Sequence, residues 1–150
     1  MDAAHSLLFA ATLVALYVMG QIWYAQVVIY PLFAKVGTLE YIEYHGFYTR
    51  KIPLPVVGPG FASFLLPMTL IFLRPDTVPA WLAYANALCG LIGLIVTVAL
   101  EIPRHGRLEK SGKNADVIRE LILFNWPRTA SVTGSAVFSV LMVLAAFRPA

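Results

Sequence analysis

The sequence predicts an all-α protein, a bundle of four transmembrane helices joined by amphipathic cytoplasmic connectors, with both termini outside the cytoplasm. Four long stretches lack charged residues, and each is near or above the ~20 residues that a helix needs to cross a bilayer. Only 13% of the residues are charged, against about 25% in soluble domains. The 150 residues form one domain with spans at about 6–30, 54–73, 79–100 and 128–147.

The distribution of basic residues predicts the orientation. Nine lie in the two connections between spans one and two and between spans three and four, and two lie on the opposite side. The positive-inside rule places both connections in the cytoplasm. We therefore expect a multi-pass protein of a bacterial inner membrane, whose basic residues contact membrane lipid and no nucleic acid. The nine are Lys35, Arg50, Lys51, Arg104, Arg107, Lys110, Lys113, Arg119 and Arg128.

Two other classes of protein fit the apolar runs less well. A soluble domain of this size cannot cover four such helices with polar surface. A cleavable signal peptide has a basic n-region and a short apolar region, whereas no Lys or Arg precedes the long first run. The single cysteine, Cys89, lies inside the third span and indicates no disulfide framework.

Prolines and glycines predict where the helices end. Pro31 predicts the end of the first helix at Tyr30, because proline cannot donate to the preceding turn. Residues 37–51 are amphipathic and predict a short helix near the membrane surface. The helix-breaking prolines and glycines at 55–60 predict an interrupted second span beside a cavity. Residues 106–113 read as a loop, residues 115–124 as an amphipathic helix, and Pro127 as the first turn of span four.

The predicted topology brings polar side chains from several helices to the cytoplasmic end. Ionisable groups at membrane depth commonly mark a site. Trp23, Gln26 and Tyr30 are spaced as one helical face, and with Trp126 they are candidates for substrate binding; interhelical hydrogen bonding is the alternative for Gln26. The candidate catalytic residues are His45, His105, Asn125 and Arg128.

Two chemistries remain open for these groups. Carboxylate and imidazole ligands can bind a metal ion, and the candidates are Glu43, His45, Glu101 and His105. Pro103 interrupts that spacing, and no repeated Glu-x-x-His pair is present. In a metal-free site, His45 or His105 would remove a proton, and Arg128 or Asn125 would stabilise the resulting anion. The structural alternative for Glu101 and Arg128 is an ion pair between them, which would neutralise both at the membrane boundary.

The motifs at 26–33, Tyr44-His45 with Arg50, 102–108, and 125–128 resemble the small four-span membrane proteins grouped with the fungal anthrone oxygenases. The resemblance implies oxidation of an anthrone to an anthraquinone with molecular oxygen as co-substrate and without an established organic cofactor. It also implies that Pro103, Trp126 and Arg128 match recurring family residues. His105 departs from the family pattern, which has an amide there.

The sequence thus predicts a small membrane oxidoreductase, oxygenase-like, acting on a lipophilic aromatic or quinone-type substrate in a pocket at the cytoplasmic end. The alternative is a non-catalytic subunit or a lipid- or quinone-binding scaffold, as a homo-oligomer or within a larger membrane complex. Gly90, Gly93, Gly134 and Ser135 on a lipid-facing surface would favour that alternative. A transporter fits less well, because the external half lacks buried charge.

Overall fold

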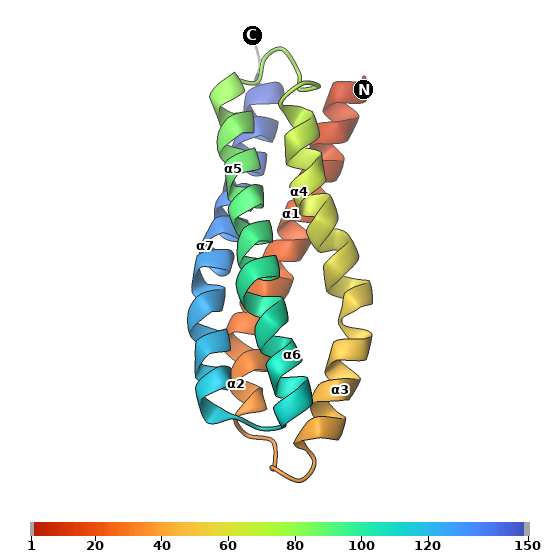
Figure 1. Cartoon of the computed structure of the whole chain (residues 1–150). Helices are drawn as coiled ribbons and strands as arrows, with labels where there is room; N and C mark the ends of the chain where they lie inside the picture. The colour runs from red at the N-terminus through yellow and green to blue at the C-terminus, as the bar shows by residue number, and fades with distance from the viewer. Residues whose placement is uncertain (1, 149–150) are drawn as a thin grey trace.

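The molecule consists of four helical rods packed side by side, described by a computed structural model over residues 2–148. The rods Ala3–Phe33, Pro53–Leu70, Ala80–Ser111 and Ala115–Ala146 are long and apolar enough to cross a membrane. Figure 1 shows both termini at one end and the connections at 34–40 and 112–114 at the other, which we call the connector end. The described residues contain no strand, which confirms the all-helical bundle.

The first rod comprises α1 (Ala3–Tyr24), a π-helical segment η1 (Ala25–Ile29) and α2 (Tyr30–Phe33). The Asp2 carboxylate caps its start by accepting a hydrogen bond from the His5 backbone N–H at 2.9 Å, which satisfies an amide that no helical carbonyl can reach. The predicted end at Tyr30 is wrong, because the helix continues through Pro31 to Phe33.

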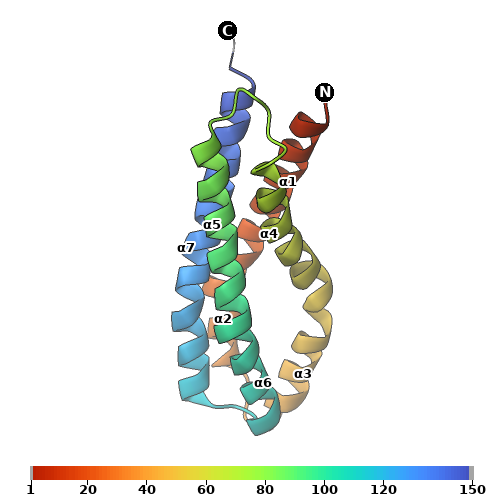
Figure 2. The ribbon, with the colours of Figure 1, turned by 45° about the horizontal axis from the view of Figure 1, so that its top comes forward.

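The second rod begins with α3 (Tyr41–Lys51) and continues through η2 (Pro53–Val57) into α4 (Gly58–Leu70). In Figure 2 this rod bows away from its neighbours near η2, and α3 extends the line of the rod rather than crossing the end of the bundle. The bow coincides with the predicted interruption at 55–60, where prolines remove backbone donors.

The third rod comprises α5 (Ala80–Val96), η3 (Thr97–Glu101) and α6 (Ile102–Ser111), and the fourth is the single helix α7 (Ala115–Ala146). The predicted loop at 106–113 is wrong for most of its length, because α6 reaches Ser111 before Gly112 turns the chain with a φ of 74°. Pro127 lies inside α7 and not in a first turn.

A proline follows each π-helical segment at the same offset. Pro31 comes two positions after the last residue of η1, Pro59 two after that of η2, and Pro103 two after that of η3. A proline lacks an N–H, and its ring clashes with the carbonyl four residues earlier. That carbonyl belongs to the central residue of each segment, namely Val27, Pro55 and Ala99.

The wider π turn lets each rod continue past its proline. The backbone N–H of Tyr30 donates to the Ala25 carbonyl, and that of Ile102 donates to the Thr97 carbonyl, each five residues earlier. Single π turns are rare and occur frequently at functional sites. Three of them in one half of this bundle mark that half as the region to search for a site.

The interior is packed solidly at both ends. One cluster of buried side chains, including Leu8, Leu70 and Met142, fills the end with the termini. A second, including Phe33, Tyr41 and Leu121, fills the connector end. Between them the bundle contains the polar groups and cavities described below.

The small residues proposed as a docking surface lie inside the bundle. A Cβ on Gly90 would lie 3.3 Å from the Ser63 carbonyl oxygen, and one on Gly134 would lie 3.0 Å from Cys89 Sγ. Gly93 and Ser135 are buried as well. Their small size allows helices to approach closely, so they give no support to a lipid-facing docking surface.

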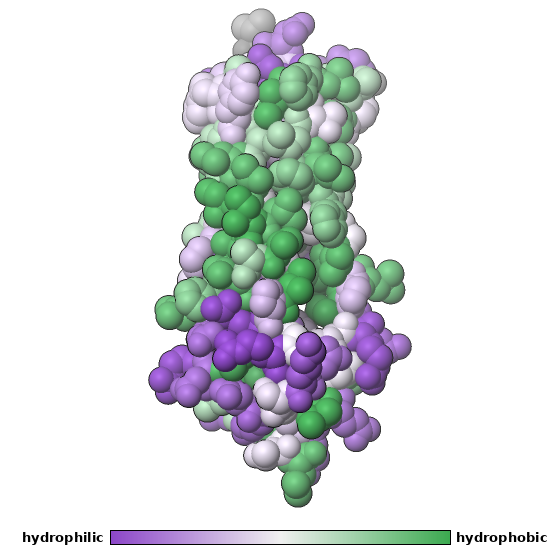
Figure 3. Space-filling model, in the orientation of Figure 1, coloured by the Kyte–Doolittle hydropathy of each residue, from purple (hydrophilic) through white to green (hydrophobic). Residues whose placement is uncertain are grey.

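The outer surface has the zones expected of a membrane protein. Figure 3 shows a broad apolar band, a large polar zone at the connector end and a smaller polar region at the end with the termini. Leu54 is 88% exposed and Phe72 86% exposed, which would be unfavourable in water but is favourable against lipid.

Candidate functional site

Three side chains from three rods form a continuous polar chain near the connector end. Nε2 of His45 in α3 lies 3.2 Å from Nδ1 of His105 in α6. Nε2 of His105 lies 3.4 Å from the hydroxyl oxygen of Tyr30 in α2. The sequence placed these residues at one level, and the structure brings them into contact. We call them the histidine–tyrosine chain.

Aromatic rings surround the two imidazoles. The Tyr41 ring stacks on His45 with centroids 5.7 Å apart, the Tyr48 ring stacks on His105 at 5.6 Å, and Phe33 meets His45 edge-on at 5.3 Å. Burial lowers the pKa of His45, an effect that the Glu109 carboxylate opposes. His45 is therefore a neutral imidazole at neutral pH and can accept a proton.

A carboxylate and a guanidinium lie near this chain without pairing. Glu101 at the end of η3 is 1% exposed, and neither of its carboxylate oxygens has a hydrogen-bond partner. Arg128 in α7 is 7% exposed. Among the ion pairs of residues 2–148 none joins Glu101 to Arg128, so the expected direct pair is wrong.

The pKa of Tyr48 is affected by both the Arg128 guanidinium and the Glu101 carboxylate. Burial raises the pKa of the Tyr48 hydroxyl to about 12, the Arg128 guanidinium opposes this shift, and the Glu101 carboxylate reinforces it. The Tyr48 phenol is consequently neutral at physiological pH. It can donate a hydrogen bond to a bound molecule but supplies no negative charge.

A cavity of about 330 Å³ adjoins the histidine–tyrosine chain, and we call it the tyrosine cavity. Tyr30 and Tyr48 line one part of it, and Arg128 contributes to its wall. Tyr24, which also lines it, is 57% exposed on the outside of the bundle. The cavity therefore extends toward the lipid-facing surface. The other lining residues are Gln21, Ile22, Ala25, Ile29, Ile52, Pro55 and Val56.

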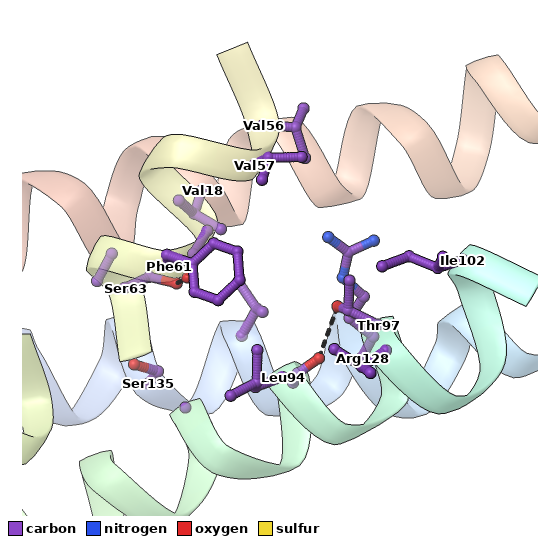
Figure 4. A pocket seen from close by; sticks show the side chains of 16 residues that line it. Val18, Val56, Val57, Phe61, Ser63, Leu94, Thr97, Ile102, Arg128 and Ser135 are labelled. Carbon is purple, nitrogen blue, oxygen red and sulfur yellow. Dashed lines mark hydrogen bonds between the residues drawn. The ribbon is translucent and has the colours of Figure 1, made fainter. Parts of the chain in front are cut away.

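A smaller cavity of about 120 Å³ lies further from the connector end, and we call it the glycine cavity because Gly60, Gly90 and Gly93 line it. Figure 4 shows the Arg128 side chain reaching from α7 toward this cavity, with its guanidinium between the Val56–Val57 segment and Ile102.

The hydroxyl groups in the glycine cavity are already satisfied. Ser63 donates to the Gly60 carbonyl at 2.7 Å, Thr97 to the Gly93 carbonyl at 2.7 Å, and Ser135 to Asn86 Oδ1 at 2.6 Å. A buried water needs two to four polar partners. Apart from Arg128 at its end, this cavity offers few, so its chemistry favours an apolar occupant.

Gln26 and Asn125 form an interhelical hydrogen-bond network. Asn125 Nδ2 donates to Gln26 Oε1 at 2.7 Å, and Gln26 Nε2 donates to the Ile122 carbonyl at 3.1 Å. Both residues are buried, and neither lines one of the two cavities. This geometry matches the alternative expectation for Gln26 and gives Asn125 the same role in joining η1 and α7.

The two candidate tryptophans lie outside the site. Trp23 is 40% exposed and Trp126 46% exposed, and their rings meet edge-on with centroids 5.9 Å apart. Trp23 Nε1 donates to Thr133 Oγ1 at 2.9 Å. The pair therefore packs on the outer surface, away from both cavities.

The four candidate metal ligands do not converge. Glu43 is exposed on α3, and no group of three His, Cys, Asp or Glu side chains within residues 2–148 could hold a metal ion. These residues therefore do not fit a metal centre.

Sequence reasoning missed several residues of the tyrosine cavity, among them Tyr48 and Gln21. Tyr48 was assigned to a surface helix, although it shares a helical face with the buried Tyr41 and His45. Gln21 was one of several polar residues near the end of the first rod, and nothing in its spacing distinguished it. Comparison of the chain with protein-family models, curated proteins and solved structures finds no match.

Proposed function

We propose that this protein is a small integral membrane oxidoreductase, oxygenase-like, that acts on a lipophilic aromatic or quinone-type substrate in the tyrosine cavity. The observation that carries the proposal is Arg128, a buried guanidinium without an ion-pair partner among the described residues, in the wall shared by two mainly apolar cavities. An unpaired buried cation is costly, and an anionic oxygen of the substrate would offset that cost.

The tyrosine cavity has the properties of a site for a small aromatic molecule. Its volume of about 330 Å³ lies within the range of ligand pockets, which combine mostly apolar walls with a few polar groups. Tyr24 connects it to the lipid-facing surface, so a lipophilic substrate can enter from the bilayer. Arg128 then binds the phenolate or enolate oxygen, and the tyrosine rings pack against the substrate.

The histidine–tyrosine chain provides a route for a proton leaving the substrate. Tyr30 accepts this proton on its oxygen as its own hydroxyl proton moves to His105 Nε2. The proton on His105 Nδ1 moves to His45 Nε2. The distances of 3.4 and 3.2 Å permit both transfers, and His45 is neutral before the reaction because burial lowers its pKa.

The glycine cavity suits a small apolar co-substrate such as dioxygen. A methylene carbon that has lost a proton transfers one electron to dioxygen, and the two radicals combine to form a carbon–oxygen bond. Protonation gives a hydroperoxide, which loses water to leave a ketone. The reaction consumes one dioxygen and converts one CH₂ group into C=O plus one water. Arg128 faces the negative charge that develops on oxygen.

The resemblance to the anthrone oxygenases supports this chemistry. Of its three recurring residues, Arg128 lines both cavities, and Pro103 follows η3, which ends at the buried Glu101. Trp126 lies on the outer surface and supports the proposal less directly.

The test is oxygen consumption by purified protein supplied with an anthrone. We expect turnover to the anthraquinone, with a large loss for Arg128→Met and His105→Ala and none for Arg119→Met, whose side chain is exposed on α7. Anthrone oxidises slowly in air, so protein-free and Arg128→Met samples set the background. Wild-type rates equal to that background would overturn the enzymatic proposal.

The rival is a non-catalytic subunit or lipid- or quinone-binding scaffold within a homo-oligomer or larger membrane complex. It predicts saturable binding of the same aromatic molecules without oxygen consumption, and purification at fixed stoichiometry with other chains. The internal position of Gly90, Gly93 and Gly134 removes the surface feature that would have favoured it.

The proposed setting is a bacterial inner membrane with the connector end in the cytoplasm and both termini outside. The excess of basic residues at the connector end, nine against two, supports this orientation through the positive-inside rule. Substrate would then enter from the bilayer near its cytoplasmic leaflet.

A further inference from the structure

One buried polar atom at the tyrosine cavity has no role in the chemistry above. Gln21 lines the cavity beside Tyr24 and Arg128, and its Oε1 atom is buried without a hydrogen-bond partner. Native structures contain few such atoms, because a buried acceptor without a donor loses its hydration and gains no hydrogen bond in return. The unpartnered Oε1 atom of Gln21 therefore requires an explanation.

The orientation of the Gln21 amide can be traced to Pro59. This proline has no N–H, so the carbonyl of Pro55, four residues earlier, lacks its usual helical donor. The hydroxyl group of Tyr17 in α1 lies 3.4 Å from that carbonyl oxygen. A carbonyl can only accept, so the Tyr17 hydroxyl donates its one proton to Pro55.

This bond determines the orientation of the Gln21 amide. Tyr17 and Gln21 are four positions apart on α1 and therefore neighbours on one face. Because the Tyr17 proton is committed to Pro55, its oxygen must accept the second bond, and Gln21 Nε2 donates to it at 2.8 Å. Oε1 is then left as a buried acceptor without a donor, in a residue that lines the cavity.

We propose that Gln21 Oε1 is a specificity-determining group that accepts a hydrogen bond from a substrate hydroxyl. This inference rests on the proposed function. It narrows the substrate class to aromatic molecules with two oxygen functions, an acidic oxygen at Arg128 and a separate hydroxyl donor at Gln21. The terminal amide torsion of glutamine is broad, so a small rotation that keeps Nε2 within reach of the Tyr17 hydroxyl would expose Oε1 to the ligand. A quinone without a hydroxyl group offers only acceptors and leaves Oε1 unpaired.

The experiment compares two probes on three proteins by calorimetric titration of the full chain in detergent. One probe is a dihydroxyanthraquinone with its hydroxyl groups on opposite outer rings, and the other is the monohydroxyanthraquinone that lacks one of them. The proteins are the wild type, Gln21→Met, which preserves length but has no acceptor, and Tyr17→Phe, which releases the amide.

We expect the wild type to bind the dihydroxy probe about tenfold more tightly than the monohydroxy probe, as one satisfied hydrogen bond provides. Gln21→Met abolishes this preference, so the two probes bind this variant with similar affinity. Tyr17→Phe weakens the preference, because the amide loses its anchor. Thermal unfolding of each variant checks that the bundle is intact.

The outcomes separate this inference from the proposed function. If both probes bind with equal affinity and Arg128→Met weakens the binding of both, the role of Gln21 is overturned and the proposed site stands. A preference that persists in Gln21→Met also overturns it. If neither probe binds the wild type, the proposed function fails and the inference fails with it.

Discussion

At the scale of single residues, Arg128 is the group on which the site depends. It is the charged residue that lines both cavities, and it lies near the phenol of Tyr48, whose pKa it lowers against the effect of burial. The Arg128 side chain therefore both lines the cavities and carries a positive charge. Substitutions can test these two properties separately.

Replacing Arg128 should weaken the binding of acidic aromatic ligands more than that of neutral ones. We expect Arg128→Met to reduce affinity for a hydroxyanthraquinone roughly 10- to 100-fold, because hydrogen bonds to charged groups contribute about 1.5–3 kcal/mol. Arg128→Lys should keep part of the affinity through its charge. Titration calorimetry measures both, with Arg119→Met as the control. Equal losses for acidic and neutral ligands would indicate a packing role only.

His45 predicts a pH dependence of stability. Burial lowers its pKa below the ordinary 6.5, so at pH values under 6.5 the unfolded state binds more protons than the folded state. Stability is then complete above that value and falls as the pH drops toward the folded-state pKa. We expect the wild-type Tm to fall between about pH 7 and 5, and His45→Gln to fall less. Parallel pH profiles for the two proteins would contradict this.

At the scale of elements, the three proline-linked π segments explain why the sequence predicted the rods but not their ends. Charge-free runs indicate spans because a helix satisfies its own backbone groups in lipid. Pro31 was expected to end a helix, but η1 supplies a wider turn and the helix continues to Phe33. Pro127 lies within α7 without a π segment before it.

The π segments also explain which site residues were predicted. The spacing of Trp23, Gln26 and Tyr30 matches one face of an α-helix, but η1 begins at Ala25 and changes the number of residues per turn. Trp23 consequently faces outward while Gln26 and Tyr30 are buried. The meeting of His45 and His105 depends on how α3 packs against α6, which no local pattern contains.

Replacing the proline after η3 should weaken ligand binding without lowering the thermal stability of the protein. Pro103→Ala gains an N–H that can donate to the Ala99 carbonyl, which favours an ordinary α-helix over the π turn. A continuous α-helix would rotate α6 and turn His105 away from His45 and Tyr30. We expect an unchanged or higher Tm with weaker ligand binding. Pro127→Ala is the control, since no π segment precedes it. Unchanged ligand affinity in Pro103→Ala would show that η3 does not position the site.

Filling the glycine cavity should weaken the binding of a gas more than the binding of the aromatic ligand. Gly60 lines this cavity, and a Cβ added there meets no atom within 4 Å, so Gly60→Leu is the substitution chosen to fill it. Small apolar cavities bind xenon, which serves as the probe. We expect xenon binding and oxygen consumption to fall while hydroxyanthraquinone affinity is kept. Gly20→Leu is the matched control, because its Cβ also meets open space and Gly20 lines neither cavity.

At the scale of the whole molecule, apolarity and charge divide the bundle along its axis. The apolar band covers the rods, and the polar zone lies at the connector end (Figure 3). Both termini lie at the other end (Figure 1). The site therefore lies toward the more basic end, where the proposed orientation puts it near the cytoplasmic leaflet.

This orientation predicts which ends of the bundle a membrane-impermeant thiol reagent can reach in intact cells. Cys89, the single cysteine, is first replaced by alanine, which fits the space beside Gly134. A cysteine is then placed at Thr77, in the turn between α4 and α5, or at the exposed Ser111 of the connector end. We expect Thr77→Cys to be labelled in intact cells and Ser111→Cys only after the membrane is permeabilised, because the basic connections stay inside. The reverse pattern would place the connector end outside, and the substrate would then approach from the outer leaflet.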